Sequence, residues 1–459
     1  MAEIKFGTDG WRAKIADGFT YENLAKVTDA FAMYILKEAK KPVVSVGYDN
    51  RFMSENYALF TAQRLAGYGF KVKLFDKAVH TPLVSWSVRN FRMDAGIMIT
   101  SSHNPCYYNG FKIKNRYGAG LSGAETARVE KLIGKSPAAK KGKLERVNYD
   151  AHYIQAVKNL IDISAIKKSG MKIVLDCMYG SGAGYMEAAL DGYKKLTVIN
   201  NKRDPLFGGI NPEPIKQNLI KLCETVKKLK ADIGIAIDGD GDRMALVNEK
   251  GEFITSHKVL VFMLLHHIKY RKMNFSFVKT ISGTFLVNKL AKEYGIKLTE
   301  TPVGFKYIGE KMITDKSVIG GEESGGVGFG YFLPERDGIF GNLTILEFLA
   351  KEGKRIGRVL AGLDKKYGEY RYDRVDVTFD EKKRKSILAK ADALEKTGRI
   401  AGKKIVSVSR LDGIKYILGD NEWVLFRFSG TEPLLRIYSE GPTDKAVQAN
   451  LKFGLKITR

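Results

Sequence analysis

The sequence predicts an α/β protein built from several similar domains, because one local pattern occurs three times along the chain. In each copy an apolar, β-branched run leads through a loop into a helix-like stretch, and a second apolar run follows. The first runs are residues 43–46, 172–176 and 278–282, and the second runs are residues 71–75, 196–200 and 296–301. Such units form parallel or mixed sheets with right-handed crossovers. An alternative stays open here, since any large α/β chain contains units of this kind.

The last part of the chain has a different pattern. An apolar run at 375–379 precedes a lysine-rich helical stretch, and two extended runs then flank a turn within 423–440. This order predicts a smaller α+β domain. A lysine- and alanine-rich segment at 135–146 is expected to be a linker, and a second junction is expected near 254–256. The predicted domains are residues 1–145, 146–252, 253–368 and 369–459.

Composition sets the broad class of protein. The 459 residues suffice for about three or four domains of roughly 100–200 residues each. The most apolar window, 259–265, is too short to span a bilayer and is expected to form a buried helix. There is no N-terminal signal pattern, and three widely spaced cysteines form no metal or disulfide pattern. We therefore expect a cytoplasmic protein that does not bind membranes.

A formal net charge of +25 raises the question of a nucleic-acid partner. The lysines are spread along the chain, and the densest runs, 140–143 and 382–385, are short and lack interleaved aromatic residues. We expect a solvated basic surface, part of which steers anionic substrates, and no nucleic-acid partner. A basic nucleic-acid-binding protein remains a distant alternative.

An acidic loop carries the strongest chemical signal. Asp238, Asp240 and Asp242 alternate with glycines between two buried-strand patterns. Three carboxylates on so short a loop repel one another unless a cation neutralises them, and oxygen-only ligands suit Mg²⁺ or Ca²⁺. An EF-hand is disfavoured, because its loop needs glycine where this chain has Arg243. We expect a catalytic metal site with positions left for a phosphate oxygen, and a plain acidic turn is the alternative.

A second motif, residues 100–114, follows another buried-strand pattern. It contains Ser102 next to His103, but adjacent side chains usually diverge, and the G-x-S-x-G turn of hydrolases is absent. Ser102 is instead a candidate phosphoryl acceptor. His103 offers a hydrogen bond, and Lys112 offers positive charge near the transferring oxygen. Taken alone, this segment is equally well explained as a polar turn.

A third motif lies near the C-terminus. Ser429, Gly430 and Thr431 form a turn whose N–H and hydroxyl groups suit a phosphate. Arg427 and Arg436 flank this turn and offer guanidinium groups for phosphate oxygens. A hairpin turn with two surface arginines explains the same residues.

Weaker signals come from glycine-rich segments. Glu322 and Ser324, within GGEESGG, offer acceptors and a donor for sugar hydroxyls, although a flexible surface loop is the simpler explanation. Arg12 in FGTDGWR and Lys306 in PVGFKYIG each place a cation close to a glycine, which is Gly304 in the second case.

Taken together and in this order, FGTDGWR, TSSHNPCYYNGFK, DGDGDR, GEESG and RFSGTEPLLR resemble the α-D-phosphohexomutase superfamily over essentially the whole chain. The resemblance implies three related α/β domains and a fourth, phosphate-binding domain around a central cleft. It implies an isomerase that interconverts hexose 1-phosphate and hexose 6-phosphate through a phosphoserine and a hexose 1,6-bisphosphate. It also implies one Mg²⁺ per chain and glucose 1,6-bisphosphate as activator.

The resemblance also implies roles for individual residues. Ser102 would carry the phosphoryl group, and its phosphate would complete a magnesium site formed by Asp238, Asp240 and Asp242. The implied catalytic residues are Ser102, His103, Lys112 and Arg12. The implied substrate-binding residues are Arg243, Gly304, Lys306, Glu322, Ser324, Arg427, Ser429, Gly430, Thr431 and Arg436.

The sugar loop departs from part of this superfamily. Several relatives that act on mannose and glucosamine phosphates carry histidine where this chain has Gly326, whereas the second glutamate, Glu323, is closer to glucomutase-type loops. We therefore expect glucose phosphates as substrates, with a phosphomannomutase, a phosphoglucosamine mutase and a phosphatase as alternatives. A small-molecule sugar phosphate is the expected partner, and the expected state is a monomer or a small homo-oligomer.

Overall fold

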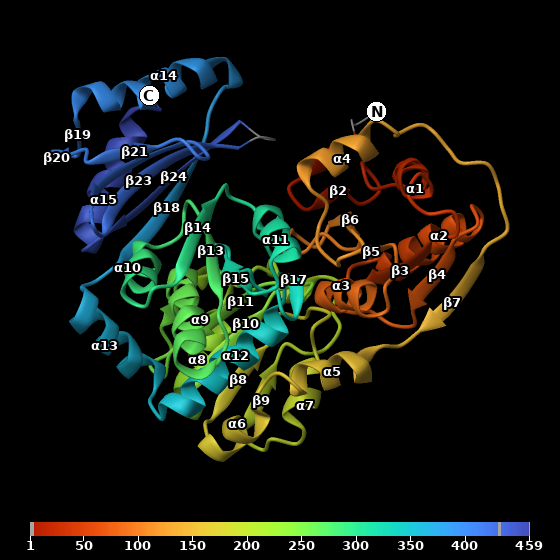
Figure 1. Cartoon of the computed structure of the whole chain (residues 1–459), viewed down its shortest axis with the longest axis horizontal. Coiled ribbons are helices and arrows are strands. Elements are labelled where there is room, and N and C mark those ends of the chain that lie inside the picture. Colours follow the sequence, from red (N-terminus) through yellow and green to blue (C-terminus); the bar gives the residue numbers. More distant parts are fainter. Residues whose placement is uncertain (1–3, 430–432, 459) are drawn as a thin grey trace. The chain divides into compact units, whose positions relative to one another are not determined.

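The structure, a computed structural model, describes residues 4–429 and 433–458. Figure 1 labels its helices and strands. The chain divides into two compact units. The first contains the described residues up to Phe275 together with Gly304–Ile356, and the second contains Ser276–Val303 and the described residues from Gly357 onward. None of the helices in the described ranges combines the length and the apolar character that a membrane crossing requires.

The N-terminal part of the first unit is built around a seven-stranded sheet of order β1-β2-β6-β5-β3-β4-β7. Its strands are β1 (Phe6–Gly7), β2 (Gly10–Lys14), β3 (Val43–Tyr48), β4 (Lys71–Phe75), β5 (Ala95–Ile99), β6 (Tyr108–Lys114) and β7 (Lys143–Val147). The accompanying helices are α1 (Tyr21–Leu36), α2 (Ser54–Ala66), α3 (Thr81–Asn90) and α4 (Gly123–Glu130). The sheet is mixed, because β3 is parallel to β4 and β5 whereas β6 is antiparallel to β5 and β2.

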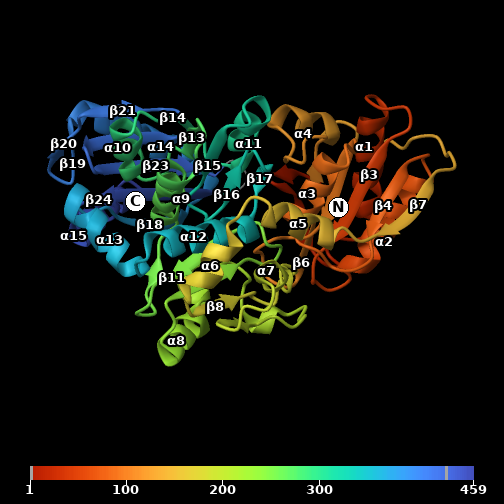
Figure 2. The same cartoon turned by 60° about the horizontal axis from the view of Figure 1, so that its bottom comes forward.

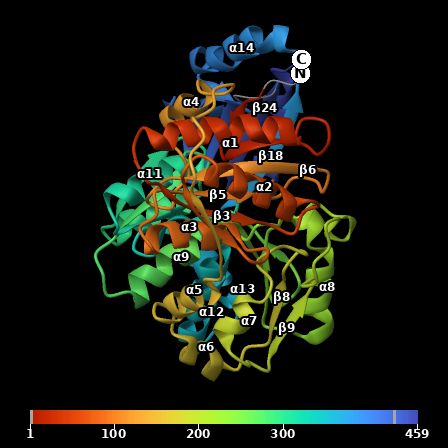
Figure 3. The same ribbon diagram turned by 90° about the vertical axis from the view of Figure 1, so that its right-hand side faces the viewer.

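Successive side chains along β3 point to opposite faces of this sheet, so their contacts show which helices cover each face. Val44 and Val46 belong to the apolar cluster that also contains residues of α1 and α2, and Figure 3 looks onto these two helices. On the other face α3 approaches closely, since a Cβ at Gly47 would lie 2.4 Å from Val84 Cγ2. Helices therefore cover both faces.

Strand β7 corrects one expectation. The sequence pattern predicts a linker at 135–146, but the last residues of that segment form β7, which pairs in parallel with β4. The sequence KLERV contains three charged residues, Lys143, Glu145 and Arg146. That pattern suits a strand at the edge of a sheet, where charges discourage further strand pairing.

The next part of the first unit has a five-stranded sheet of order β12-β11-β10-β8-β9, which lies in the region that Figure 2 brings forward. Its strands are β8 (Ile173–Asp176), β9 (Leu196–Ile199), β10 (Ile233–Ile237), β11 (Met244–Val247) and β12 (Phe253–Ile254). The accompanying helices are α5 (Asp150–Lys158), α6 (Ile163–Ser169), α7 (Tyr185–Leu190) and α8 (Ile220–Leu229), with short 3₁₀ turns at Phe207–Gly209 and Lys216–Asn218. Strand β8 is parallel to β9 and β10, and β11 is antiparallel to β10.

The remainder of the first unit contains an antiparallel ladder and three helices. The strands are β15 (Val318–Gly321), β16 (Val327–Phe329) and β17 (Leu333–Arg336), and the helices are α9 (Ser256–Tyr270), α11 (Phe305–Thr314) and α12 (Gly338–Glu352). The apolar window 259–265 is fully enclosed within α9, as the sequence predicts. Helix α12 begins directly after β17 and is capped by Asp337, whose Oδ1 accepts from Phe340 N.

The second unit joins a parallel pair of strands to an antiparallel sheet of order β18-β24-β23-β22-β21. Its strands are β13 (Ser276–Thr280), β14 (Lys297–Thr301), β18 (Arg371–Thr378), β19 (Arg399–Ile400), β20 (Lys403–Lys404), β21 (Ser407–Ser409), β22 (Ile414–Gly419), β23 (Glu422–Phe428) and β24 (Leu434–Gly441). Its helices are α10 (Phe285–Glu293), α13 (Ile356–Tyr367), α14 (Arg384–Thr397) and α15 (Asp444–Lys456), with a 3₁₀ turn at Glu381–Lys383. The predicted fold class, α/β parts with mixed sheets followed by a C-terminal α+β part, is confirmed.

Candidate active site

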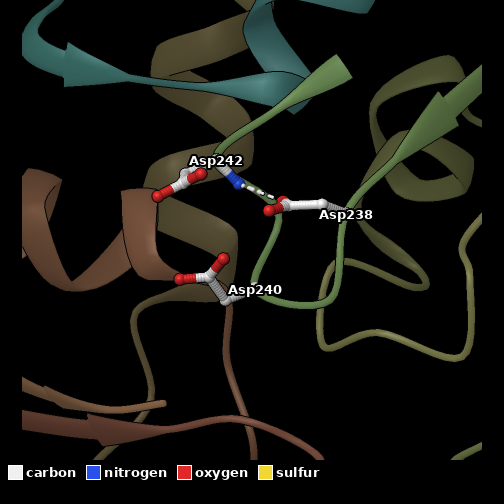
Figure 4. A group of neighbouring side chains, drawn as sticks. All are labelled: Asp238, Asp240 and Asp242. Atoms are coloured by element: carbon white, nitrogen blue, oxygen red, sulfur yellow. Dashed lines mark hydrogen bonds between the residues drawn. The ribbon is translucent and has the colours of Figure 1, made fainter. Parts of the chain in front are cut away.

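Three aspartates gather on the loop between β10 and β11. Asp238, Asp240 and Asp242 are all fully buried, and each offers a carboxylate oxygen within 4.8 Å of the others. Figure 4 shows the three carboxylates turned toward one common space. Strands flank this loop on both sides, which removes the EF-hand alternative. The glycines allow close packing, because a Cβ at Gly239 would lie 2.8 Å from the carbonyl oxygen of Ser102.

Each aspartate has one oxygen fixed by the protein. Asp238 Oδ1 accepts from the backbone N–H groups of Asp242 and Arg243, at 2.9 and 3.1 Å. Asp240 Oδ2 accepts from Thr81 Oγ1 at 2.5 Å and from Lys112 Nζ at 2.8 Å. Lys112 Nζ also donates to Asp242 Oδ2 at 2.9 Å.

The opposite oxygens of the same carboxylates remain available. Asp240 Oδ1 and Asp242 Oδ1 are buried, and neither has a hydrogen-bond partner among the described residues. Asp238 Oδ2 accepts a long hydrogen bond, 3.2 Å, from Ser102 Oγ. Buried carboxylate oxygens without partners are costly, and the two that lack partners converge with Asp238 Oδ2 in a way that fits a small, hard divalent cation. The residues present therefore fit a metal site.

Ser102 lies at the edge of this group. It follows β5 and is almost fully buried, and its φ of 52° lies in the left-handed region that residues with a Cβ seldom adopt. Its Oγ is 3.4 Å from His103 Nδ1. Burial first, then the cations Arg243, Arg12 and Lys112, hold the pKa of His103 well below its usual value. The imidazole beside Ser102 is therefore neutral.

Lys112 projects from β6 into the carboxylates. Its Nζ lies 2.8 Å from Asp240, 2.9 Å from Asp242 and 2.8 Å from Asp9. Burial alone lowers the pKa of this ammonium group, but the three carboxylates outweigh burial and raise the pKa above its usual value. Lys112 is therefore a fixed positive charge in this state.

Three further residues of this network are not identified by the sequence patterns. Arg336, at the end of β17, lies 2.6 Å from Asp9 and 2.8 Å from Asp242. Asp9 lies within the motif FGTDGWR, so the sequence could have marked it as a candidate site residue. Nothing in the sequence marks Arg336. Thr81, the third of these residues, begins α3 and binds Asp240 through its hydroxyl.

The glycine-rich loop between β15 and β16, residues 322–326, contacts the same network. Glu322 Oε1 accepts from Ser324 Oγ at 2.6 Å and lies 3.6 Å from Arg336 Nη1. Burial raises the pKa of Glu322 in spite of Arg336. The structure also explains Gly326, since a Cβ there would lie 2.3 Å from Arg336 Cδ.

The remaining predicted residues of the first unit lie around this centre. Arg12 Nη1 donates to Asn104 Oδ1 at 2.8 Å, and Arg243 Nη1 lies 3.3 Å from Glu213 Oε1. Gly304 precedes α11 with φ 128°, and a Cβ there would lie 3.0 Å from Thr8 Cγ2. Lys306 lies beside the start of α4, because its Nζ would be 3.6 Å from a Cβ added at Gly123. Among the described residues, no contact joins Lys306 to the three aspartates.

The predicted phosphate turn belongs to the second unit. Arg427 and Arg436 are directly opposite each other on the antiparallel strands β23 and β24. Like charges in this position are destabilising unless anions lie nearby. Arg427 Nε donates to Asp412 Oδ2 at 2.7 Å, and Arg436 Nε lies 3.6 Å from Asp376 Oδ2. Ser429 is buried next to this pair, whereas Gly430 and Thr431 lie outside the described residues.

Comparison with known proteins supports the same interpretation of the chain. The sequence models of phosphoglucomutase/phosphomannomutase α/β/α domains I, II and III match residues 3–140, 151–251 and 256–367, and that of the C-terminal domain matches residues 375–452. The phosphoglucomutase/phosphomannomutase of Thermococcus kodakarensis is 34% identical, with 98% of each chain covered. A probable phosphoglucosamine mutase of Methanosphaera stadtmanae is 32% identical over 96% of this chain and 95% of its own. A crystal structure described as a phosphomannomutase from Thermus thermophilus aligns with a TM-score of 0.87 at 34% identity, covering 99% of both chains.

The fold and the site define a phosphohexomutase, an isomerase that transfers a phosphoryl group within its substrate. The chain belongs to the phosphoglucomutase/phosphomannomutase family, because the four domain models of this family match it almost from end to end.

Proposed function

We propose that this enzyme interconverts glucose 1-phosphate and glucose 6-phosphate through a phosphorylated Ser102 and a glucose 1,6-bisphosphate intermediate. The observation that carries the proposal is the placement of Ser102 Oγ, which lies 3.2 Å from Asp238 Oδ2 and therefore beside a buried aspartate triad. Phosphoryl transfer depends mainly on position and on neutralised oxygen charge, and this arrangement supplies both.

We propose that Asp238, Asp240 and Asp242 hold one Mg²⁺, which when bound neutralises phosphoryl oxygens. The chain's own cations act on the same group. Lys112 is held in its charged form by its carboxylate partners and faces the transferring oxygens, and Arg12, fixed through Asn104, approaches from the neighbouring strand β2.

In the first transfer the bond from phosphorus to Ser102 Oγ breaks, and a bond to the free sugar hydroxyl forms. The hydroxyl loses its proton as the new ester forms, and Ser102 Oγ regains one when it leaves. Neutral His103, whose Nδ1 is 3.4 Å from Oγ, is proposed to accept the proton that the sugar hydroxyl loses and then to pass this proton to Ser102 Oγ. The second transfer is the reverse step with the other phosphate of the bisphosphate.

Substrate recognition is assigned to the remaining predicted residues. Glu322 and Ser324 present an acceptor and a donor for sugar hydroxyls. Arg243, Gly304 and Lys306 are proposed to contact sugar or phosphate. Arg427, Ser429, Gly430, Thr431 and Arg436 are proposed to bind the phosphate that does not react.

The preference for glucose rests on Gly326, which stands where several relatives that act on mannose and glucosamine phosphates carry histidine, and on Glu323, which is closer to glucomutase-type loops. Arg336 occupies the space into which a side chain at position 326 would extend. The alternative is a phosphoglucosamine mutase or a phosphomannomutase with the same chemistry, and it is favoured by the names of the similar proteins described above. We further propose that glucose 1,6-bisphosphate primes Ser102, that the protein acts in the cytoplasm as a monomer or small homo-oligomer, and that nucleic acids are not ligands.

The test is a mutase assay with Mg²⁺ and a trace of glucose 1,6-bisphosphate. It compares glucose, mannose and glucosamine 1-phosphates by kcat/KM, and it also records free phosphate to detect phosphatase activity. Ser102→Ala should abolish turnover. Ser101→Ala is the matched control, because Ser101 is the adjacent buried serine and its Oγ has no hydrogen-bond partner among the described residues. Preference for another sugar would overturn the specificity, and full activity of Ser102→Ala would overturn the mechanism.

A further inference from the structure

Arg51 is a fully buried arginine on the loop between β3 and α2, and the chemistry described above does not use it. Its loop follows β3, and the loop that carries Ser102 follows β5. These two strands are parallel neighbours in the seven-stranded sheet. Since the carboxyl ends of parallel neighbours meet at one edge of a sheet, the two loops lie together.

Four N–H groups of the Arg51 guanidinium point at the backbone of the Ser102 loop and of the first residue of β6. Nη2 donates to the carbonyl oxygen of Ser102 at 2.6 Å and to that of Asn104 at 2.7 Å. Nη1 donates to the carbonyl oxygen of Pro105 at 2.8 Å and to that of Tyr108 at 3.1 Å. One side chain therefore binds three carbonyl groups of the Ser102 loop and that of Tyr108, the first residue of β6.

The fifth N–H group connects Arg51 to a closed ring of hydrogen bonds. Nε donates to Asp49 Oδ2 at 3.2 Å, and the same oxygen accepts from Thr100 Oγ1 at 2.5 Å. Thr100 Oγ1 in turn accepts from the backbone N–H of Ser102 at 2.8 Å. Ser102 is thus held at its carbonyl oxygen by Arg51 and at its N–H by Thr100, and Asp49 joins the two.

We propose that Arg51 is a positioning residue for the phosphoryl transfer, which fixes the Ser102 loop so that Oγ faces the acidic triad. This inference rests on the proposed function. Ser102 occupies the left-handed region at φ 52°, and such a conformation persists only where the surrounding structure enforces it. Arg51 supplies that constraint, because five donors in a planar fork satisfy four carbonyls and a carboxylate together.

Lysine is the informative replacement at this position. An ammonium group keeps the charge but has three donors, so at least two of the five acceptors lose their hydrogen bond to this side chain. The loop then relaxes, and a displacement of about 1 Å at a reacting atom costs on the order of 100-fold in rate. The expected result for Arg51→Lys is a kcat lower by about 100-fold with KM little changed, because the phosphate-binding residues of the second unit are untouched.

The matched control is Arg64→Lys. Arg64 lies on α2 of the same domain and forms a two-pronged pair with Asp29, at 2.5 and 2.7 Å, but no described contact joins it to the Ser102 loop. Both variants are measured for kcat, KM, thermal unfolding and the rate at which glucose 1,6-bisphosphate phosphorylates Ser102, followed by intact mass. Arg51→Lys should slow phosphorylation by the same factor as kcat, whereas Arg64→Lys should lower only stability.

The outcomes separate this inference from the proposed function. Wild-type protein that is never phosphorylated on Ser102 overturns both. Normal wild-type phosphorylation with an unchanged rate in folded Arg51→Lys, or an equal loss in both arginine variants, overturns the inference alone. Should Arg51→Lys not fold, Asp49→Asn keeps the side-chain volume and removes the charge that orients Arg51. It should also slow phosphorylation, and an unchanged rate would count against the proposal.

Discussion

Gly326→Ala adds a single methyl group at a crowded point of the glycine-rich loop between β15 and β16. The new Cβ would lie 2.3 Å from Arg336 Cδ, 2.9 Å from Arg336 Cγ and 3.4 Å from Glu322 Oε1. Arg336 has little freedom to yield, because it is nearly fully buried and its guanidinium lies within 2.8 Å of Asp9 and Asp242. Either this loop or Arg336 must therefore move.

The expected cost follows from these contacts. Overpacking of one methyl group in a dense interior typically costs about 1–3 kcal/mol. Complete loss of one partner of a buried ion pair costs about 3–5 kcal/mol, and here the pair is displaced rather than deleted. We expect the free energy of unfolding of the protein to fall by about 1–3 kcal/mol. We also expect kcat to fall by about tenfold or more, since Arg336 contacts one of the triad aspartates.

The assay is urea unfolding combined with steady-state kinetics. Gly362→Ala is the matched control, because Gly362 lies within α13 and a Cβ added there would have no described atom within 4 Å beyond its own helix backbone. Alanine there should stabilise the helix by about 0.5–1 kcal/mol. If the two variants shift stability equally and both keep full activity, the steric reasoning about Gly326 and Arg336 is wrong.

Two further predictions concern the metal loop and the pH dependence of stability. Thr81→Val removes the hydroxyl that fixes Asp240, so it should weaken Mn²⁺ binding by about 10-fold or more, measured by calorimetry without substrate. Thr61→Val is the control and should leave Mn²⁺ binding unchanged, because Thr61 is buried and its Oγ1 lacks a partner among the described residues. Burial raises the pKa of Asp337 from 3.8 to about 7, so the folded protein binds more protons than the unfolded chain between these values, and stability falls as pH rises through this range. Asp337→Asn should remove that part of the slope in urea unfolding between the two pKa values, and an unchanged slope would contradict the assignment.

The sequence predicts those parts of the site that lie close together in the chain. Asp238, Asp240 and Asp242 share one loop, so their convergence depends only on local backbone geometry. The strand pattern likewise places Ser102 at the end of a buried strand, where the structure has it. Those two features mark candidate residues for both halves of the proposed reaction centre, and the resemblance of the combined motifs assigns their roles.

The parts that the sequence does not predict depend on tertiary contacts. Arg336 and Asp9 form a hydrogen bond although they are 327 residues apart in sequence, and Thr81 and Asp240 do so across 159 residues. No local pattern marks such residues, because their role comes from packing between domains of the first unit. The edge strand β7 is missed for a different reason: its three charged residues are typical of a linker, and only its pairing with β4 identifies it as a strand.

The second unit is discontinuous in sequence, which has a consequence for how the chain folds as it is synthesised. The carbonyl oxygen of Ile281 and the N–H of Phe285 bind Lys415 and Glu440, which follow 134 and 155 residues later. At about 5–20 residues per second, a ribosome needs roughly 7 to 30 seconds to supply these partners. Throughout that interval Ile281, Phe285 and Val303 lack the side chains of Trp423, Leu425 and Tyr438, against which they pack in the finished protein. Chains that terminate before β23 and β24 therefore leave the segment 276–303 as a target for chaperones and proteases, although the proposed chemical centre is already complete.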